Sequence, residues 1–445
     1  MKILSITAGA ADMYCGSCLR DNALAAELLR RGHDVTLMPV YTPTLTDESN
    51  VSSGNPVLFG GISVYLQQHL PLFRRTPRLL DRLWDAAPVI RALAGRSMKV
   101  DPRVLGEMTV SMLKGEDGHQ RKEFEKLIAW LKDEPRPDIV NIPNSLLIAM
   151  AGPVRRTLNR PVVITMQGED LFLDGLQEPF RTQSIELIRR QVADVHLFLA
   201  VSEFYVQRMH GMLGIPHDKI AVVPLGINTD GFEGPRPPAG EALRIGYFAR
   251  VAPEKGLREL AEAYRILRRE FGVPARLEAA GYLGAEHRPY LAQVTQSLQQ
   301  WGLASEFTYH GTLDREQKIA FLRSLDVLSV PAPYPDPKGI YLLEAMAAGT
   351  PVVQPRLGAF VETIERTGGG LLTAPTAQGV AEGLREIAQS PDLAARLGAQ
   401  GARGVGEHYS VSAEADRVLE VFEHVLSHTS KPEASPMPSV AGRPS

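Results

Sequence analysis

Two carboxylates near residue 340 have the type and spacing to bind hydroxyl groups. Asp336 precedes a short apolar segment, and Glu344 lies eight residues later, within it. A carboxylate accepts hydrogen bonds from two neighbouring hydroxyls, so Glu344 could hold a ribose and Asp336 a sugar. In the structural alternative, Asp336 is an N-cap, Pro337 takes the first helical position and Glu344 is a solvated helix residue. The spacing alone leaves both interpretations open.

Between these carboxylates the sequence predicts the start of a helix that can bind an anion. Residues 340–348 are predominantly apolar, and Gly349 and Pro351 are typical of a helix end. Gly339 allows a ligand to approach the backbone closely, because it has no Cβ. The first turn of this helix presents free N–H groups and the positive end of the helix dipole to the preceding loop. We therefore expect a phosphate to bind at Gly339, Ile340, Tyr341 and Leu342.

Two basic residues could neutralise the same anion from another loop. Arg250 and Lys255 follow a predicted strand at 243–248, at the entrance of a predicted helix. Cations fixed at such a place suit a diphosphate. Exposed arginines and lysines are common, so an ordinary surface role is the alternative.

Gln167 follows a predicted strand at 161–166 and precedes two acidic residues. Its amide can hydrogen-bond a sugar hydroxyl, but it cannot take up a proton near neutral pH. We expect Gln167 to orient a substrate without acting as a base. In the alternative, Glu169 and Asp170 cap the next helix.

The order of predicted elements indicates two domains of one kind. A strand, a loop, a helix and a second strand run from Lys2 to Pro39, and the same order restarts at about residue 242 after the stretch PRPPAGEA. Each start is a βαβ unit, so we expect two Rossmann-like α/β domains that bind ligands outside the carboxyl ends of their strands. Gly9 and Gly16 are too far apart for the dinucleotide fingerprint, which gives an NAD enzyme little support.

These motifs resemble those of the family 4 retaining glycosyltransferases. The two carboxylates, separated by seven residues and followed by AMAAGTPVV, are similar to the donor-site signature of that family. The Arg-x4-Lys-Gly pattern from Arg250 and the Asn-x-Asp-x-x-Phe turn from Asn228 are also similar. The chain departs from the usual pattern with Asp336 in place of Glu, Gln167 in place of His and Ala249 in place of Gly.

The resemblance implies a GT-B fold, in which two facing Rossmann-like, doubly wound domains enclose a cleft. It also implies that a hexose moves from a nucleoside diphosphate sugar to an unidentified glycan, lipid or small-molecule acceptor, with retention at the anomeric carbon. The implied catalytic residues are Arg250, Lys255, Asp336 and Gln167, and the implied donor-binding residues are Gly16, Gly339, Ile340, Tyr341, Leu342 and Glu344. A non-catalytic nucleotide-sugar-binding protein and a nucleotide-sugar 2-epimerase of the same architecture are the alternatives.

The expected domain limits follow from the same order of elements. We expect an acceptor-side domain at 1–235, a donor domain at 242–405 and a disordered tail at 429–445. The resemblance implies that a last helix, at about 410–428, packs back on the first domain.

Composition excludes some classes of partner and location. The net charge is −3 with interspersed signs, so a nucleic-acid partner is not expected. No long apolar run and no signal-peptide pattern occur, and we expect a cytoplasmic protein. The basic, amphipathic stretch 74–103 could lie on an anionic inner-membrane surface, or its apolar stripe could pack on the sheet.

Neither a metal nor a cofactor is expected, since the nucleotide sugar is itself the substrate. The chain has no Asp-x-Asp sequence, and its two cysteines cannot form a zinc site alone. Cys15 and Cys18 form a C-x-x-C sequence, for which a redox enzyme, a regulatory disulfide and a pair of unreactive thiols are the interpretations.

Overall fold

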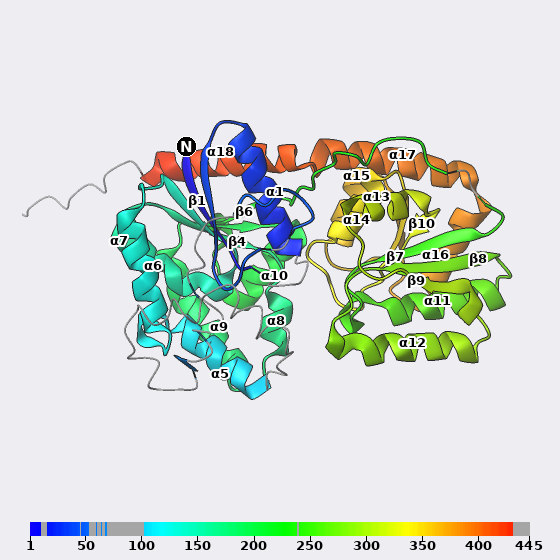
Figure 1. Cartoon of the computed structure of the whole chain (residues 1–445), viewed down its shortest axis with the longest axis horizontal. Coiled ribbons are helices and arrows are strands. Elements are labelled where there is room, and N and C mark those ends of the chain that lie inside the picture. The colour runs from blue at the N-terminus through cyan, green and yellow to red at the C-terminus, as the bar shows by residue number, and fades with distance from the viewer. Residues whose placement is uncertain are drawn as a thin grey trace, which may run out of the picture.

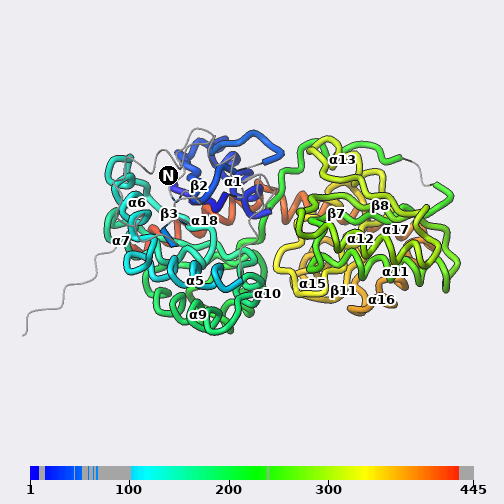
Figure 2. Tube along the Cα trace, turned by 60° about the horizontal axis from the view of Figure 1, so that its bottom comes forward, coloured from blue at the N-terminus to red at the C-terminus, as the bar shows by residue number. Residues whose placement is uncertain are grey.

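The computed structural model describes residues 1–9, 16–44, 46–52, 59, 64, 67–68, 102–237 and 240–429. They form two lobes side by side, each built on a sheet of six strands, and all paired strands are parallel (Figures 1 and 2). The two Rossmann-like α/β domains predicted from the sequence are confirmed.

The N-terminal sheet has the order β2-β1-β3-β4-β5-β6. Its strands are β1 (Lys2–Thr7), β2 (Asp34–Pro39), β3 (Ile139–Ile142), β4 (Val162–Met166), β5 (Leu197–Ala200) and β6 (Ile220–Val222). Every residue of β3 and β4 is buried, as expected for central parallel strands covered by helices on both faces. The helices are α1 (Gly16–Arg30), α5 (Pro102–Leu113), α6 (Arg121–Asp133), α7 (Ala151–Leu158), α8 (Asp170–Gly175), α9 (Phe180–Gln191) and α10 (Glu203–Leu213).

The C-terminal sheet has the order β12-β11-β10-β7-β8-β9. Its strands are β7 (Leu243–Phe248), β8 (Ala275–Ala280), β9 (Phe307–Tyr309), β10 (Val327–Leu328), β11 (Val352–Pro355) and β12 (Gly370–Thr373). The helices are α11 (Leu257–Arg269), α12 (Arg288–Gln300), α13 (Arg315–Ser324), α14 (Ile340–Ala347), α15 (Phe360–Thr367), α16 (Ala377–Gln389) and α17 (Pro391–His408). Helices α11 and α12 lie on one side of this sheet, and α13 and α14 lie on the other (Figure 1).

The last helix, α18 (Val411–Thr429), returns to the first lobe. Figure 1 shows α17 on the C-terminal lobe continuing into α18 on the N-terminal lobe. Its buried residues Ala415, Val418 and Phe422 share a hydrophobic cluster with Ile3 of β1 and Leu28 of α1. This packing joins the first strand and the last described helix in one lobe.

Parts of the sequence predictions fall at or beyond the limits of the described residues. Thr429, where we expected the tail to start, ends helix α18, and 430–445 lie outside the described residues. The basic stretch 74–103 also lies outside them, except for 102–103, which begin α5. Cys18 is buried in α1, while Cys15 lies outside the described residues.

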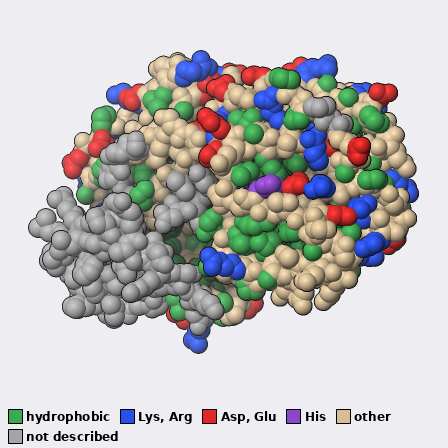
Figure 3. Space-filling view, turned by 45° about the vertical axis from the view of Figure 1, so that its right-hand side comes forward, with side chains coloured by type: hydrophobic (Ala, Val, Ile, Leu, Met, Phe, Trp, Pro, Cys, Tyr) green, Lys and Arg blue, Asp and Glu red, His purple; other side chains and the backbone are tan. Residues whose placement is uncertain are grey.

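The described surface carries both signs of charge. Acidic and basic side chains alternate on the face shown in Figure 3, with hydrophobic side chains between them. Within the described ranges, the longest helices are too polar to cross a bilayer, and the apolar ones are too short.

Candidate active site

The C-terminal part of the site lies at the switch point of its sheet. β7 and β10 are neighbours, and the chain continues from them to opposite edges of the sheet. A crevice forms outside the carboxyl ends of the strands at such a point. Lys255 lies in the loop after β7, and Asp336 lies in the loop after β10. The topology therefore brings these two residues together from positions far apart in the sequence.

Gly256 allows the loop after β7 to pack closely against the loop after β10. Its φ of 76° lies in the left-handed region, and a Cβ there would be 2.1 Å from the carbonyl oxygen of Pro331. Because only glycine fits so close to this backbone, the Lys-Gly pair places Lys255 beside the segment that follows β10.

Lys255 is the centre of a compact polar cluster. Its Nζ lies 2.6 Å from Oδ2 of Asp336 and 3.2 Å from the hydroxyl of Tyr334. The same ammonium group lies 5.3 Å and 5.4 Å from the ring centres of Tyr334 and Tyr341, within the range of cation–π attraction. Lys255 is thus fixed by one carboxylate and two aromatic rings.

Both oxygens of Asp336 are engaged by donors of the protein. Oδ2 accepts from Lys255 and from the Tyr341 hydroxyl at 3.1 Å, while Oδ1 accepts from the backbone N–H groups of Lys338 at 3.0 Å and Gly339 at 3.4 Å. Burial raises the pKa of Asp336, but the charge of Lys255 and these hydrogen bonds outweigh it and hold the pKa at about 2. This geometry makes Asp336 an anchor for Lys255, and its predicted contact with sugar hydroxyls stays a prediction.

Helix α14 begins after this anchor, and its first amides have no acceptor within the helix. Gly339 precedes the helix with a φ of 66°, so the alternative that Pro337 takes the first helical position is wrong. The N–H of Leu342 already donates to the carbonyl oxygen of Gly339 at 2.9 Å. Within the described residues, the N–H groups of Ile340 and Tyr341 donate to no other group. The amides available to an anion are therefore those of Ile340 and Tyr341.

The N-terminal lobe faces this helix end through the start of α1. A Cβ on Gly16 would lie 3.0 Å from Cδ1 of Ile340, and Nζ of Lys338 donates to Oγ of Ser17 at 2.9 Å. A Cβ on Gly168 would lie 3.5 Å from Cε of Lys338. Gly16 and Gly168 are thus brought to the same side of the loop that enters α14.

Gln167 is buried beside this contact, and its amide orientation is fixed. Its Nε2 donates to the carbonyl oxygen of Pro143 at 3.1 Å and to Oδ1 of Asp21 at 3.4 Å. Both partners are acceptors, so the nitrogen must occupy that side. Its Oε1 is buried and has no hydrogen-bond partner in the described part of the chain. Gln167 therefore has one oriented acceptor that no described group uses, and its predicted contact with a sugar hydroxyl stays a prediction.

The acidic residues after Gln167 do not cap the next helix, and that alternative is wrong. The carboxylate of Glu169 accepts from the backbone N–H groups of Ser145 and Gln167, at 2.9 Å and 2.8 Å, and from the Tyr205 hydroxyl at 3.1 Å. Asp170 accepts from Tyr205 and Arg208. Glu169 therefore joins the ends of β3 and β4 and holds the backbone of Gln167.

Arg250 stands apart from the cluster of Lys255. Its guanidinium pairs with Glu254 of the same loop, and its side chain is 44% exposed. Its carbonyl oxygen accepts from the hydroxyl of Tyr247 at 3.0 Å. Among the described residues, the Arg250 side chain does not contact Lys255, so its predicted role at a diphosphate stays a prediction.

Glu344 lies in the second turn of α14 and is nearly buried. Its Oε1 accepts from Nζ of Lys318 at 2.8 Å. The same ammonium group donates to Oδ2 of Asp47 in the N-terminal lobe at 2.6 Å. The alternative that Glu344 is solvated is wrong, because 9% of the residue is exposed.

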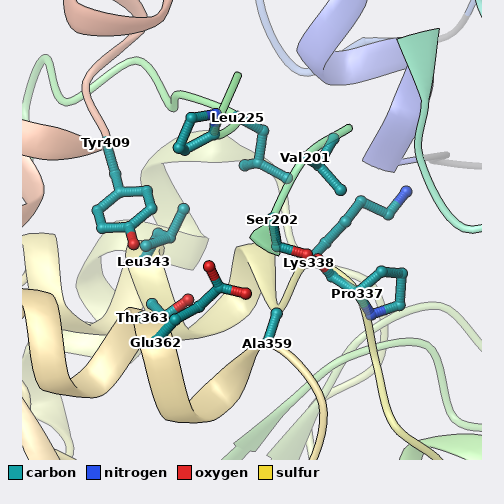
Figure 4. A pocket seen from close by; sticks show the side chains of 11 residues that line it. Val201, Ser202, Leu225, Pro337, Lys338, Leu343, Ala359, Glu362, Thr363 and Tyr409 are labelled. Atoms are coloured by element: carbon teal, nitrogen blue, oxygen red, sulfur yellow. Dashed lines mark hydrogen bonds between the residues drawn. The ribbon is translucent and has the colours of Figure 1, made fainter. Parts of the chain in front are cut away.

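A narrow pocket between the lobes continues from the loop that enters α14 (Figure 4). Ser202 donates through Oγ to the carbonyl oxygen of Pro337 at 3.0 Å. Glu362 of α15 accepts from the first amides of α10, those of Glu203 and Phe204, at 3.0 Å and 3.1 Å. A carboxylate of one lobe thus caps a helix of the other, which holds the lobes in contact beside the site.

Four contacts of the site were not anticipated from the sequence, and they involve Tyr334, Lys338, Lys318 and Asp47. Tyr334 and Lys338 flank Asp336, so their closeness in the sequence was a usable signal. Lys318 and Asp47 come from a helix and a loop with no motif, and only the assembled lobes show their role.

Two family models match the chain. The model described as Glycosyl transferases group 1 matches residues 235–404, and the model described as Glycosyltransferase Family 4 matches residues 110–230. These two segments contain Gln167 on one side and Lys255, Asp336 and Glu344 on the other.

Curated relatives are transferases of sugars. A 2-deoxystreptamine glucosyltransferase of Streptomyces kanamyceticus is 27% identical over 314 residues, and the match covers 64% of this chain and 77% of that protein. A phosphatidyl-myo-inositol mannosyltransferase of Mycobacterium leprae is 36% identical over 135 residues, or 30% of this chain and 36% of that protein.

Solved structures match nearly the whole chain. Sucrose-phosphate synthase from Thermosynechococcus elongatus has a TM-score of 0.72 at 17% identity, covering 96% of this chain and 99% of that one. Anabaena HepE in complex with UDP-glucose has a TM-score of 0.66 at 15% identity, covering 95% and 100%. At such identities the likeness shows the fold alone. The chain therefore belongs to the family 4 glycosyltransferases and has the two-domain GT-B fold that its sequence predicts.

Proposed function

We propose that this protein is a retaining glycosyltransferase that moves a hexose from a nucleoside diphosphate sugar to an acceptor hydroxyl. The observation that carries the proposal is that Asp336 joins Lys255 to the loop that enters α14, at the switch point and opposite Gly16. The first amides of this helix, those of Ile340 and Tyr341, have no acceptor among the described residues. Helix amides and a fixed ammonium group form a site for a dianionic leaving group.

The chemistry makes an electrostatic demand that this arrangement meets. When the bond between the sugar and the diphosphate breaks, negative charge grows on the diphosphate. Positive groups that are already oriented stabilise that charge without reorganisation. Lys255 is such a group, because Asp336 and the two tyrosine rings hold it in place. Arg250 adds a second cation if its guanidinium turns from Glu254 to the phosphates.

The remaining residues orient the donor. Glu344 accepts hydrogen bonds from the ribose hydroxyls, and Oε1 of Gln167 accepts one from a sugar hydroxyl. Asp336 reaches the sugar only by exchanging one of its present donors, so its principal role is to position Lys255. Gln167 cannot act as a base, which disfavours a 2-epimerase at this site.

The donor and acceptor are drawn from the chemistry of the relatives. HepE is described with UDP-glucose, and a Mycobacterium tuberculosis relative is described as GDP-mannose-dependent. We therefore propose a UDP-hexose or GDP-hexose as donor. A lipid acceptor would fit a protein that acts in the cytoplasm at the inner membrane surface, and a small aminocyclitol would fit a freely diffusing one.

The test measures release of free nucleoside diphosphate from UDP-glucose and GDP-mannose. We expect slow release without an acceptor, and we expect Lys255→Ala to abolish most of it. Binding of either donor by calorimetry without any release, even with candidate acceptors, would instead indicate a non-catalytic nucleotide-sugar-binding protein.

A further inference from the structure

The ribose-binding end of the proposed donor site contains a buried lysine shared between the two lobes. Lys318 lies on α13, and its side chain is 7% exposed. Its Nζ contacts Oε1 of Glu344 on α14 and Oδ2 of Asp47 in the loop after β2. A lysine is rarely buried unless it is paired, and this one is paired twice.

The charges of this group depend on one another. Burial lowers the pKa of Lys318, but Glu344 and Asp47 outweigh burial and raise it above its usual value, so the lysine stays charged. Two carboxylates within reach of one ammonium group would repel each other without it. Lys318 therefore places a positive charge 2.8 Å from the nearly buried carboxylate of Glu344.

One oxygen of Glu344 is left for a ligand. Lys318 engages Oε1, and within the described residues Oε2 of Glu344 accepts no hydrogen bond. The lysine thus fixes the carboxylate from one side, and Oε2 can accept from a hydroxyl on the other.

The N-terminal lobe presents Asp47 on a fixed loop. Asn22 of α1 donates to the carbonyl oxygen of Ser49 at 3.0 Å and accepts from the N–H of Val51 at 3.0 Å. Helix α1 is also the helix whose start faces α14 through Gly16. The position of Asp47 is therefore linked to the same contact that closes the phosphate end of the site.

We propose that Lys318 is a positioning residue for Glu344, and that Asp47 of the opposite lobe holds Lys318 in place. The ribose-binding end of the donor site is then complete only when both lobes are in contact. This inference rests on the proposed function, because it assigns Glu344 to the ribose.

The same helix offers a matched control. Arg315, one turn before Lys318, pairs with Glu48 at 2.9 Å and donates to the carbonyl oxygen of Asp230 at 2.9 Å. Arg315 ties the lobes and their connecting segment together but does not touch Glu344. Arg315→Met therefore removes one contact between the lobes, while the Lys318–Asp47 pair and the Glu362 cap still hold them together and Glu344 keeps its partner.

The experiment compares UDP with 2′,3′-dideoxy-UDP, and GDP with 2′,3′-dideoxy-GDP, by isothermal titration calorimetry. Hydrogen bonds to a charged group are strong, so the wild-type protein should prefer the ribose form of the nucleotide it binds by about 30-fold. In Lys318→Met this preference should fall to about threefold, while Lys318→Arg should retain most of it. Asp47→Asn should lower it by about threefold, and Arg315→Met should leave it unchanged.

Thermal unfolding shows whether each variant is folded. If Lys318→Met does not fold, the double variant Asp47→Asn/Lys318→Met is used instead, because it removes one of the two carboxylates that the single variant leaves unpaired. The same fall in ribose preference is expected. A full ribose preference in the folded variant would overturn the inference and leave the proposed function standing. An equal loss in Arg315→Met would also overturn it, because general lobe contact would then explain the effect. If the wild-type protein binds neither UDP nor GDP, the proposed function and this inference both fail.

Discussion

The carboxyl ends of the two sheets carry polar groups of different kinds. In the C-terminal lobe the groups are charged and pair with one another, as Lys255 does with Asp336. In the N-terminal lobe the carboxylates of Glu169 and Asp170 are held by protein donors, and three neutral atoms beside them are buried without partners among the described residues: Oε1 of Gln167, Oδ1 of Asn144 and Oγ of Ser145. A buried polar atom without a partner carries a desolvation cost that a ligand hydroxyl can remove.

This difference indicates that the two lobes suit different parts of the donor. The C-terminal end is already ordered for charge, so it suits a diphosphate whose charge grows during the reaction. The N-terminal end offers neutral acceptors, which suit the uncharged hydroxyls of a sugar. Substitutions at the two ends should therefore have effects of different size and kind.

The largest effect is expected at the charged end. Lys255→Ala removes the fixed cation opposite the leaving group and should lower kcat by about 100-fold. Steady-state kinetics with the donor that the protein uses measures this. Lys255→Arg, which retains the charge, is the control and should recover part of the rate. Turnover within twofold of wild type in Lys255→Ala would remove the assignment of Lys255 to the diphosphate.

The next effect concerns stability against acid. The pKa of Asp336 is lowered to about 2 in the folded protein from an ordinary 3.8. A group with a lowered pKa stabilises the fold above its unfolded pKa, and this contribution is lost as the pH falls through the folded value. We expect Asp336 to contribute about 2 kcal/mol of unfolding free energy at neutral pH and to lose it between about pH 4 and pH 2.

Denaturant unfolding at several pH values measures that loss. In Asp336→Asn the part of the acid dependence that belongs to this carboxylate should be absent. If the variant and the wild-type protein lose stability in parallel over this range, Lys255 does not hold Asp336 in its charged form.

A smaller effect is expected at the neutral end. Gln167→Leu removes one acceptor for a sugar hydroxyl and should raise KM for the donor or lower kcat/KM by about tenfold. Affinity for the nucleoside diphosphate without the sugar should stay unchanged, which separates this end from the charged one. An equal loss for the nucleotide alone would place Gln167 with the phosphates instead.

No effect is expected from metal removal. The site proposed here supplies positive charge from Lys255, Arg250 and helix amides, and the chain has no Asp-x-Asp sequence. Activity in EDTA should equal activity in buffer, as measured by nucleotide release. Strict dependence on an added divalent ion would contradict the proposed mechanism.

Much of this architecture could be predicted from local patterns. The restart of the βαβ order near residue 242 reflects hydrophobic periodicity and turn residues, which act over short stretches of chain. Helix α14 was predicted for the same reason. Gly339 precedes its apolar residues, and Gly349 and Pro351 follow them as local signals of a helix end. In the long segment from Tyr41 to Pro135 we noted a helical apolar stripe only within 74–103, and helices α5 and α6 were not predicted.

The sequence by itself determined the two-lobed α/β fold, the positions of Lys255, Asp336 and Gly339 in loops before helices, and that of Glu344 inside a helix. Only the tertiary structure decided which donors each carboxylate meets. Asp336 is engaged by Lys255, 81 residues before it, and Glu344 is engaged by Lys318 and through it by Asp47, 271 residues before Lys318. Such pairs form where parallel strands bring distant loops to one edge and where two lobes meet. Local propensity carries no information about those distances.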